Sequence, residues 1–194
     1  ISRGWVPDAT TESRATDASA SLTVGIDIGG TKIHAASYDA TSDRLLEARR
    51  ATDHFGGRAV LDQVTEVVTE LAGGRRQDAV VVGLPGVVDP QDHLLSEAPN
   101  LPGWGGFDVA AALAEACGAP VTVENDVNLA AWGEHAWTGL ADLAFVAVGT
   151  GIGVGQVAGG RIVRGPDGAA GEVHDLPVGP DRVDLEAVVS GPAL

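Results

Sequence analysis

Apolar positions along the chain fall into two kinds of pattern. Runs rich in β-branched residues predict strands, and apolar residues spaced three and four apart predict a helix over residues 58–71. A strand, a long loop over 87–106 and further helices and strands follow. This order predicts a mixed sheet with helices on its faces, and so a protein of the α/β class. The other predicted elements are strands over 22–28, 32–38, 44–50, 78–84, 120–124, 143–148 and 161–164, a strand that ends at 157, and helices over 107–117 and 125–137.

The strand over 22–28 runs into the turn Gly29-Gly30-Thr31-Lys32. Glycines adopt backbone angles that are closed to other residues, so the turn is predicted to expose backbone N–H groups beside a hydroxyl and an ammonium group. Such a concavity suits a phosphate chain. Asp27, at the end of the strand, is placed to hold a divalent cation through water. The alternative is an ordinary glycine hairpin.

A second strand, glycine turn and strand occupy residues 143–157, with Gly149-Thr150-Gly151-Ile152-Gly153 in the middle. This repeats the pattern of residues 22–38 and suggests two related lobes with a cleft between them. Two matched turns that face each other across a cleft favour a polyphosphate held from both sides. Neither turn has the spacing of a P-loop, so a pair of plain hairpins is the alternative.

Asn125 and Asp126 follow the predicted strand over 120–124, at the start of a helix. Side chains at such a junction project from the sheet edge into a crevice, where Asp126 can take a proton from a hydroxyl group and Asn125 can hydrogen-bond a neighbouring one. Both residue types are also preferred as helix caps, which is the alternative interpretation. Asn100 and Glu172 are further polar candidates, and a plain turn residue is the alternative for Asn100.

The balance of charges excludes one class of partner. The chain carries 27 acidic and 12 basic side chains, and the basic ones form no patch, so it is predicted not to bind nucleic acid. The solitary Cys117 excludes an intrachain disulfide framework and is compatible with a reducing cytosol. No apolar run reaches the ~20 residues of a membrane helix, and the start carries no signal segment. A cytoplasmic protein without a membrane partner is predicted.

Six motifs, in order along residues 22–194, together resemble the ROK family. That family comprises bacterial sugar kinases, including glucokinases, and sugar-responsive repressors, all on the actin-like ATPase fold, which is ribonuclease H-like. Each motif is weak by itself, and six in register are far more specific. The motifs are Asp27-Ile28-Gly29-Gly30-Thr31-Lys32, Gly83 to Asp89, Ala98-Pro99-Asn100-Leu101, Glu124-Asn125-Asp126-Val127-Asn128, Gly149-Thr150-Gly151-Ile152-Gly153 and Gly168 to Glu172.

The resemblance implies a function and the residues that carry it. It implies a glucokinase-like enzyme that transfers the γ-phosphoryl group of ATP to a hexose hydroxyl, with Mg²⁺ bound to Asp27 through water. Asp126 would be the catalytic base. The sugar, a hexose or an amino sugar, would be bound by Asn100, Asn125, Glu172 and Glu186. The nucleotide phosphates would be bound by Asp27, Gly29, Gly30, Thr31, Lys32, Gly149, Thr150 and Gly151.

The resemblance also implies two actin-like lobes. Residues 1–21 are predicted to be a flexible leader and 22–124 the N-terminal lobe. Residues 125–194 are predicted to be the first part of a C-terminal lobe that is truncated in this sequence. Family members are often dimers or tetramers, so a homodimer or higher homo-oligomer is expected.

The sequence departs from the family pattern at His174 and Asp175. The family usually reads Gly-Glu-x-Gly-His at this point, whereas His174 and Asp175 take the last two places here, and residues 176–184 replace a cysteine-rich zinc loop. No zinc site is therefore expected. Two other functions stay open. One is the sugar-sensing domain of a ROK-type repressor, which would contact nucleic acid only through an absent N-terminal DNA-binding domain, and the other is a family member with neither activity.

Overall fold

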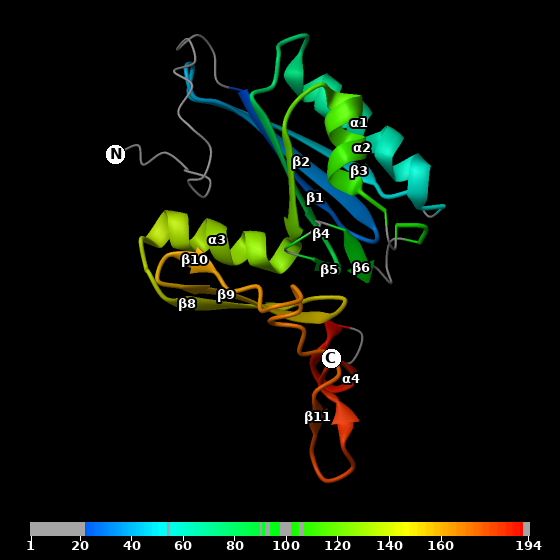
Figure 1. Cartoon of the computed structure of the whole chain (residues 1–194), viewed down its shortest axis with the longest axis vertical. Helices are drawn as coiled ribbons and strands as arrows, with labels where there is room; N and C mark the ends of the chain where they lie inside the picture. The colour runs from blue at the N-terminus through cyan, green and yellow to red at the C-terminus, as the bar shows by residue number, and fades with distance from the viewer. Residues whose placement is uncertain are drawn as a thin grey trace.

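The computed structural model of the chain describes residues 22–53, 55–89, 91, 94–97, 102–104 and 107–191. The predicted leader, residues 1–21, and the predicted sugar ligand Asn100 lie outside the described residues. Figure 1 shows the large sheet and the helices beside it in the upper part of the view, and a smaller sheet and the C-terminal elements in the lower part.

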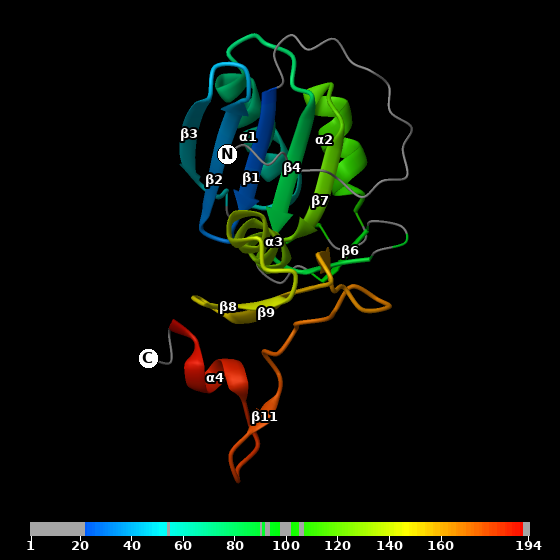
Figure 2. The same cartoon turned by 90° about the vertical axis from the view of Figure 1, so that its left-hand side faces the viewer.

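A five-stranded mixed sheet forms the larger part, in the order β3-β2-β1-β4-β7 (Figure 2). β1, β2 and β3 are antiparallel neighbours, whereas β4 runs parallel to β1, and β7 parallel to β4. The carboxyl ends of β1, β4 and β7 therefore meet at one edge of the sheet. The strands are β1 (Leu22–Ile28), β2 (Lys32–Asp39), β3 (Arg44–Ala51), β4 (Ala79–Leu84) and β7 (Val121–Asn125).

Two helices, α1 (Gly57–Ala72) and α2 (Val109–Cys117), cover one face of this sheet and close the hydrophobic core (Figure 2). α1 ends at Gly73, whose φ of 58° is the left-handed conformation that favours glycine at a helix C-cap. The buried residues of α1 keep the spacing from which the helix was predicted; they are Val60, Leu61, Val64, Val67, Val68, Leu71 and Ala72.

The predicted loop over 87–106 is partly wrong. It contains an antiparallel ribbon of β5 (Val87–Val88) and β6 (Leu95–Glu97), because strands of two and three residues are too short to show an alternating pattern. In the same region the fully buried Trp104 donates its indole N–H to the Gly57 carbonyl oxygen (2.8 Å). This bond fixes the segment to the start of α1.

α2 begins two residues later than predicted. Asp108 is its N-cap and not a member of its first turn, because Oδ1 of Asp108 accepts the N–H of Ala111 (2.8 Å). Such a cap needs non-helical backbone at the capping residue.

A single helix, α3 (Asp126–Thr138), lies between the large sheet and a three-stranded antiparallel sheet of order β10-β9-β8 (Figure 1). α3 packs closely on β9 because two glycines face it. A Cβ at Gly155 would lie 2.2 Å from the Val127 carbonyl oxygen, and one at Gly153 would lie 3.0 Å from Val127 Cγ2. The strands are β8 (Leu143–Val148), β9 (Ile152–Ala158) and β10 (Arg161–Ile162), so the strand predicted over 161–164 is shorter than expected.

The last described elements are β11 (Pro177–Val178), β12 (Val183–Asp184) and the short helix α4 (Leu185–Val189), which the pattern did not predict. No helix in the described part of the chain has both the length and the apolar character needed to cross a membrane. The mixed sheet with helices on its faces confirms the predicted α/β class. The division into lobes at residue 124 stays a prediction.

Candidate active site

The start of α3 lies at the sheet edge where β1, β4 and β7 end (Figure 2). Asp27 pairs in register with Gly83, and Gly83 with Glu124. A Cβ at Gly83 would lie 3.1 Å from Leu129 Cδ1 and 3.4 Å from the Asp126 Cα, so the missing side chain lets α3 approach the sheet. Asp27 and Asp126 are thereby brought close enough for their charges to interact.

Asp126 is half-buried and is the first residue of α3. Burial raises the pKa of its carboxyl group, the N–H of Val127 at 2.8 Å lowers it, and the negative charge of Asp27 raises it. A carboxylate whose pKa is raised in this way is a stronger proton acceptor than an ordinary aspartate. Both position and pKa suit the predicted role of Asp126 as a base.

Asp27 has an exposed side chain beside two basic residues. The surrounding protein still removes enough water to raise the pKa of Asp27, while the charges of His34 and Lys32 lower it. His34 is the register partner of Asp27 on β2, and Lys32 begins that strand. The edge therefore combines a carboxylate with positive charge from the neighbouring strand.

The turn Gly29–Lys32 is closed by a hydrogen bond from the Gly29 N–H to the Lys32 carbonyl oxygen (2.9 Å). Thr52 holds the other side of the turn. Its N–H donates to the Thr31 carbonyl oxygen (3.1 Å), and its hydroxyl group donates to the Gly29 carbonyl oxygen (2.6 Å). The expectation of unusual backbone angles is wrong, because neither glycine has a positive φ. Space is the constraint instead, since a Cβ at Gly29 would lie 3.1 Å from the Lys32 carbonyl oxygen. The side chains of Thr31 and Lys32 are exposed.

The second glycine turn, Gly149–Gly151, joins β8 to β9 and has a carboxylate beside it. The N–H of Ile152 donates to Glu186 Oε2 (3.2 Å), and a Cβ at Gly151 would lie 2.5 Å from the same oxygen. Glu186 thus takes up one backbone donor next to the turn that is predicted to bind phosphate. Its sugar contact, and the apposition of the two turns across a cleft, stay predictions.

Asn125 is the N-cap of α3, so the alternative interpretation of this residue is confirmed. Its Oδ1 accepts the N–H of Asn128 (3.0 Å), and its Nδ2 donates to the Gly86 carbonyl oxygen (3.1 Å). A side-chain amide has further donor and acceptor capacity, and the predicted sugar contact stays a prediction.

Glu124 and Arg164 form an ion pair that the sequence did not predict. Arg164 Nε lies 2.6 Å from Glu124 Oε2. Glu124 is 5% exposed, and its Oε1 accepts the Nδ2–H of Asn128 (3.0 Å). Glu124 belongs to a motif that the sequence singles out, but no local pattern signals a partner 40 residues away.

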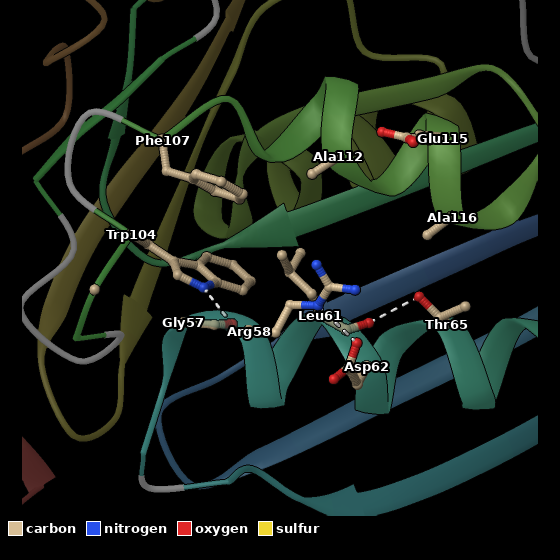
Figure 3. A pocket seen from close by; sticks show the side chains of 11 residues that line it. Gly57, Arg58, Leu61, Asp62, Thr65, Trp104, Phe107, Ala112, Glu115 and Ala116 are labelled. Carbon is tan, nitrogen blue, oxygen red and sulfur yellow. Dashed lines mark hydrogen bonds and ion pairs between the residues drawn. The ribbon is translucent and has the colours of Figure 1, made fainter.

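A cavity of about 430 Å³ lies between α1 and α2, on the face of the large sheet that these two helices cover (Figure 2). Figure 3 shows Trp104, Phe107 and Leu61 beside it, with Arg58 and Asp62 on α1. None of the predicted site residues lines this cavity, so it is not part of the candidate active site.

Comparison with known protein families identifies the relatives of this chain. The profile of the ROK family matches residues 23–188. The chain belongs to the ROK family. The motifs had predicted this membership, which is confirmed.

Similar ROK proteins include sugar kinases. The chain is 33% identical to a glucokinase of Streptomyces coelicolor over 163 residues, 82% of this chain and 51% of that protein. It is 34% identical to an N-acetylmannosamine kinase of Shigella boydii over 182 residues, 87% of this chain and 61% of that protein. The chain therefore spans about half the length of the curated relatives it matches.

A solved structure confirms the predicted actin-like ATPase fold. The crystal structure of a ROK family glucokinase from Streptomyces griseus, in complex with glucose and AMPPNP, matches this chain with a TM-score of 0.78 and 34% identity. The match covers 89% of this chain and 58% of the other.

The departure from the ROK pattern at residues 174 and 175 changes what lies beside Glu172. His174 Nδ1 is 3.3 Å from Glu172 Oε2, and the His174 carbonyl oxygen accepts the N–H of Glu186 (3.0 Å). Two of the four predicted sugar ligands, Glu172 and Glu186, therefore contact His174. Within the described ranges, no group of three or more His, Cys, Asp or Glu side chains is arranged to hold a metal ion. The expected absence of zinc stays a prediction.

Proposed function

We propose that the protein is a glucokinase-like enzyme that transfers the γ-phosphoryl group of ATP to a hexose hydroxyl. The observation that carries this proposal is the Asp126 carboxyl group, whose pKa is raised by burial and by Asp27 at the edge of the parallel strands. The relatives named glucokinase and N-acetylmannosamine kinase support a hexose or amino sugar as substrate. The AMPPNP in the S. griseus structure supports ATP as the donor.

In the proposed reaction, Asp126 accepts the proton of the sugar hydroxyl as its oxygen attacks the γ-phosphorus of ATP. A new O–P bond forms, the bond from the γ-phosphorus to the bridging oxygen breaks, and ADP leaves with the electron pair. The exposed ammonium group of Lys32 lies on the turn that would receive the phosphates. The proposed sugar ligands are Asn100, Asn125, Glu172 and Glu186, and the proposed phosphate ligands are the turns Gly29–Lys32 and Gly149–Gly151.

The residues present fit the Mg²⁺ ion that such chemistry uses. Magnesium in kinase sites is bound by one or two carboxylates, by waters and by the phosphates of the substrate. The exposed carboxylate of Asp27, whose negative charge raises the pKa of Asp126, would hold the Mg²⁺ ion through water. Bound Mg²⁺ supplies charge neutralisation of the phosphate oxygens.

The proposal extends to location and assembly. A cytoplasmic enzyme is supported by the single cysteine, which fits a reducing compartment. A homodimer or higher homo-oligomer is proposed only because members of the ROK family are often dimers or tetramers.

A coupled assay for ADP tests the proposed function. Purified protein is supplied with Mg-ATP and with glucose or N-acetylmannosamine, and sugar binding is measured in parallel by calorimetry. We expect ADP release that depends on one of the sugars, and Asp126→Asn should lower kcat by about 10²–10⁴-fold. Sugar binding without ADP release would contradict the kinase and support a sugar-sensing module. Neither binding nor turnover would contradict both.

A further inference from the structure

The carboxylate of Glu124 is buried and bonded on both oxygens. Its Oε1 accepts the N–H of Asn125 (3.1 Å) and the Nδ2–H of Asn128 (3.0 Å), and its Oε2 accepts the Nε–H of Arg164 (2.6 Å). An ionised carboxylate is stable in the protein interior only with such partners. Glu124 therefore ties Arg164 to the start of α3.

Two of these donors lie on either side of Asp126. Asn125 precedes Asp126 as the N-cap of α3, and Asn128, which is 2% exposed, lies in the first turn of the helix. Because Glu124 bonds to both, the orientation of the backbone that carries Asp126 depends on where the Glu124 carboxylate sits.

The third donor, Arg164, begins the loop that leads to Glu172. The carbonyl oxygen of Arg164 accepts the N–H of Ala170 (3.0 Å), which closes a loop over residues 165–169. The N–H of Glu172 then donates to the Ala169 carbonyl oxygen (3.2 Å). One residue thus bonds to Glu124 through its side chain and sets the base of the Glu172 loop through its backbone.

We propose that Glu124 and Arg164 are positioning residues that couple the Asp126 turn to the Glu172 loop. The pair keeps the proton acceptor and the proposed sugar-binding carboxylate at a fixed spacing, so that both reach one substrate. The inference rests on the proposed function, because a sugar is the ligand that both would share. Displacing a reacting group by about 1 Å can lower the reaction rate by about 10²-fold. This is the loss of rate expected when the ion pair of Glu124 and Arg164 is broken.

The test compares Arg164→Met, Arg164→Lys and Glu124→Gln with Arg161→Met, which removes an exposed arginine of β10. Steady-state kinetics give KM for sugar and for ATP, and amide hydrogen exchange is measured on the same proteins. Arg164→Met should lower kcat/KM for the sugar by about 10²-fold and leave KM for ATP unchanged. Arg164→Lys should recover part of the loss, because its ammonium group can also donate to Glu124, and Arg161→Met should behave as the unsubstituted protein.

Hydrogen exchange separates this inference from the proposed function. With Arg164→Met and Glu124→Gln, exchange should become faster both in residues 124–129 and in residues 164–172, and stay unchanged in α1. Faster exchange confined to residues 164–172 would overturn the coupling. So would a loss of activity that follows only the folded fraction, with both KM values unchanged. Absence of sugar-dependent ADP release from the unsubstituted protein would contradict the kinase, and the exchange result would still decide the coupling.

Discussion

Gly155 lies directly against the backbone of Val127. A Cβ at this glycine would stand 2.2 Å from the Val127 carbonyl oxygen and 2.8 Å from the Cβ of Ala131. Both neighbours belong to α3, and Asp126 is the first residue of that helix. The small sheet therefore sets the position of the helix that carries the proposed base.

Gly155→Ala should destabilise the protein. The added methyl group meets backbone that has no room to yield, and overpacking of this kind costs about 1–3 kcal/mol. Gly133→Ala is the matched control, because Gly133 is exposed on the same α3 and a Cβ there would meet no other part of the protein. The control should stabilise by roughly 0.5–1 kcal/mol, the usual difference between alanine and glycine in a helix. Urea unfolding curves measure both, and equal effects would contradict the close packing.

Asp126→Asn should make the protein more stable while it lowers the proposed activity. The folded-state pKa of Asp126 is raised above its ordinary value, so stability falls as the pH rises through the interval between the unfolded and folded pKa. The neutral amide avoids that loss. The variant should therefore melt at a higher temperature than its parent near neutral pH, and the gain should vanish below about pH 4. Thermal unfolding at several pH values tests this, with Glu66→Gln on the exposed face of α1 as control. An equal melting temperature at neutral pH would argue against a raised pKa.

Asp39→Asn should show the opposite dependence on pH. The hydroxyl of Ser42 (2.7 Å) and the guanidinium group of Arg75 (2.6 Å) hold the pKa of Asp39 well below its usual range. A lowered pKa contributes stability that is present above the unfolded value and lost as the pH falls through the folded one. The variant should be less stable than its parent at pH 7, and the two should converge as the pH drops below about 4. Arg75→Gln in the same melting experiments should reduce the difference at pH 7.

Glu186→Gln should strengthen nucleotide binding. The carboxylate of Glu186 bonds to the N–H of Ile152, beside the turn that is proposed to receive phosphate, and like charges repel. Two unit charges about 4 Å apart in a water-like medium interact by ~1 kcal/mol, so KM for ATP should fall by about fivefold. If Glu186 also binds the sugar as proposed, KM for the sugar should rise in the same variant. Glu134→Gln, an exposed residue of α3, is the control, and an unchanged KM for ATP would count against repulsion at this turn.

Local patterns predicted the elements whose folding depends on local signals. The spacing of Val60, Val64 and Val67 marks the buried side of α1, and Gly73 marks its end. The strands β1, β2 and β3 follow one another as neighbours in the sheet, so their order along the chain already contains their pairing. Local patterns also predicted that Asp126 lies at a junction between a strand and a helix, and that a glycine turn follows β1.

Contacts between distant segments escaped prediction. Nothing around Arg164 distinguishes it from a solvated arginine, and only the closed loop after β10 brings it to Glu124. The ribbon of β5 and β6 has too few residues for any periodicity. Glu186 is brought to Ile152 by β11, β12 and α4. No periodic pattern of apolar residues predicts how these short elements are arranged.

The strand order of the large sheet has a consequence for the growing polypeptide. β1 has β2 on one side, which is translated next, and β4 on the other, which is translated some fifty residues later. Ile28, the last residue of β1, leaves the ribosome about 50 residues before β4 begins, an interval of roughly 3–10 s at ~5–20 residues per second. Throughout that interval one side of β1 offers unpaired backbone groups to any passing strand. Chaperone contact or a translational pause should therefore matter most while residues 39–84 are being made.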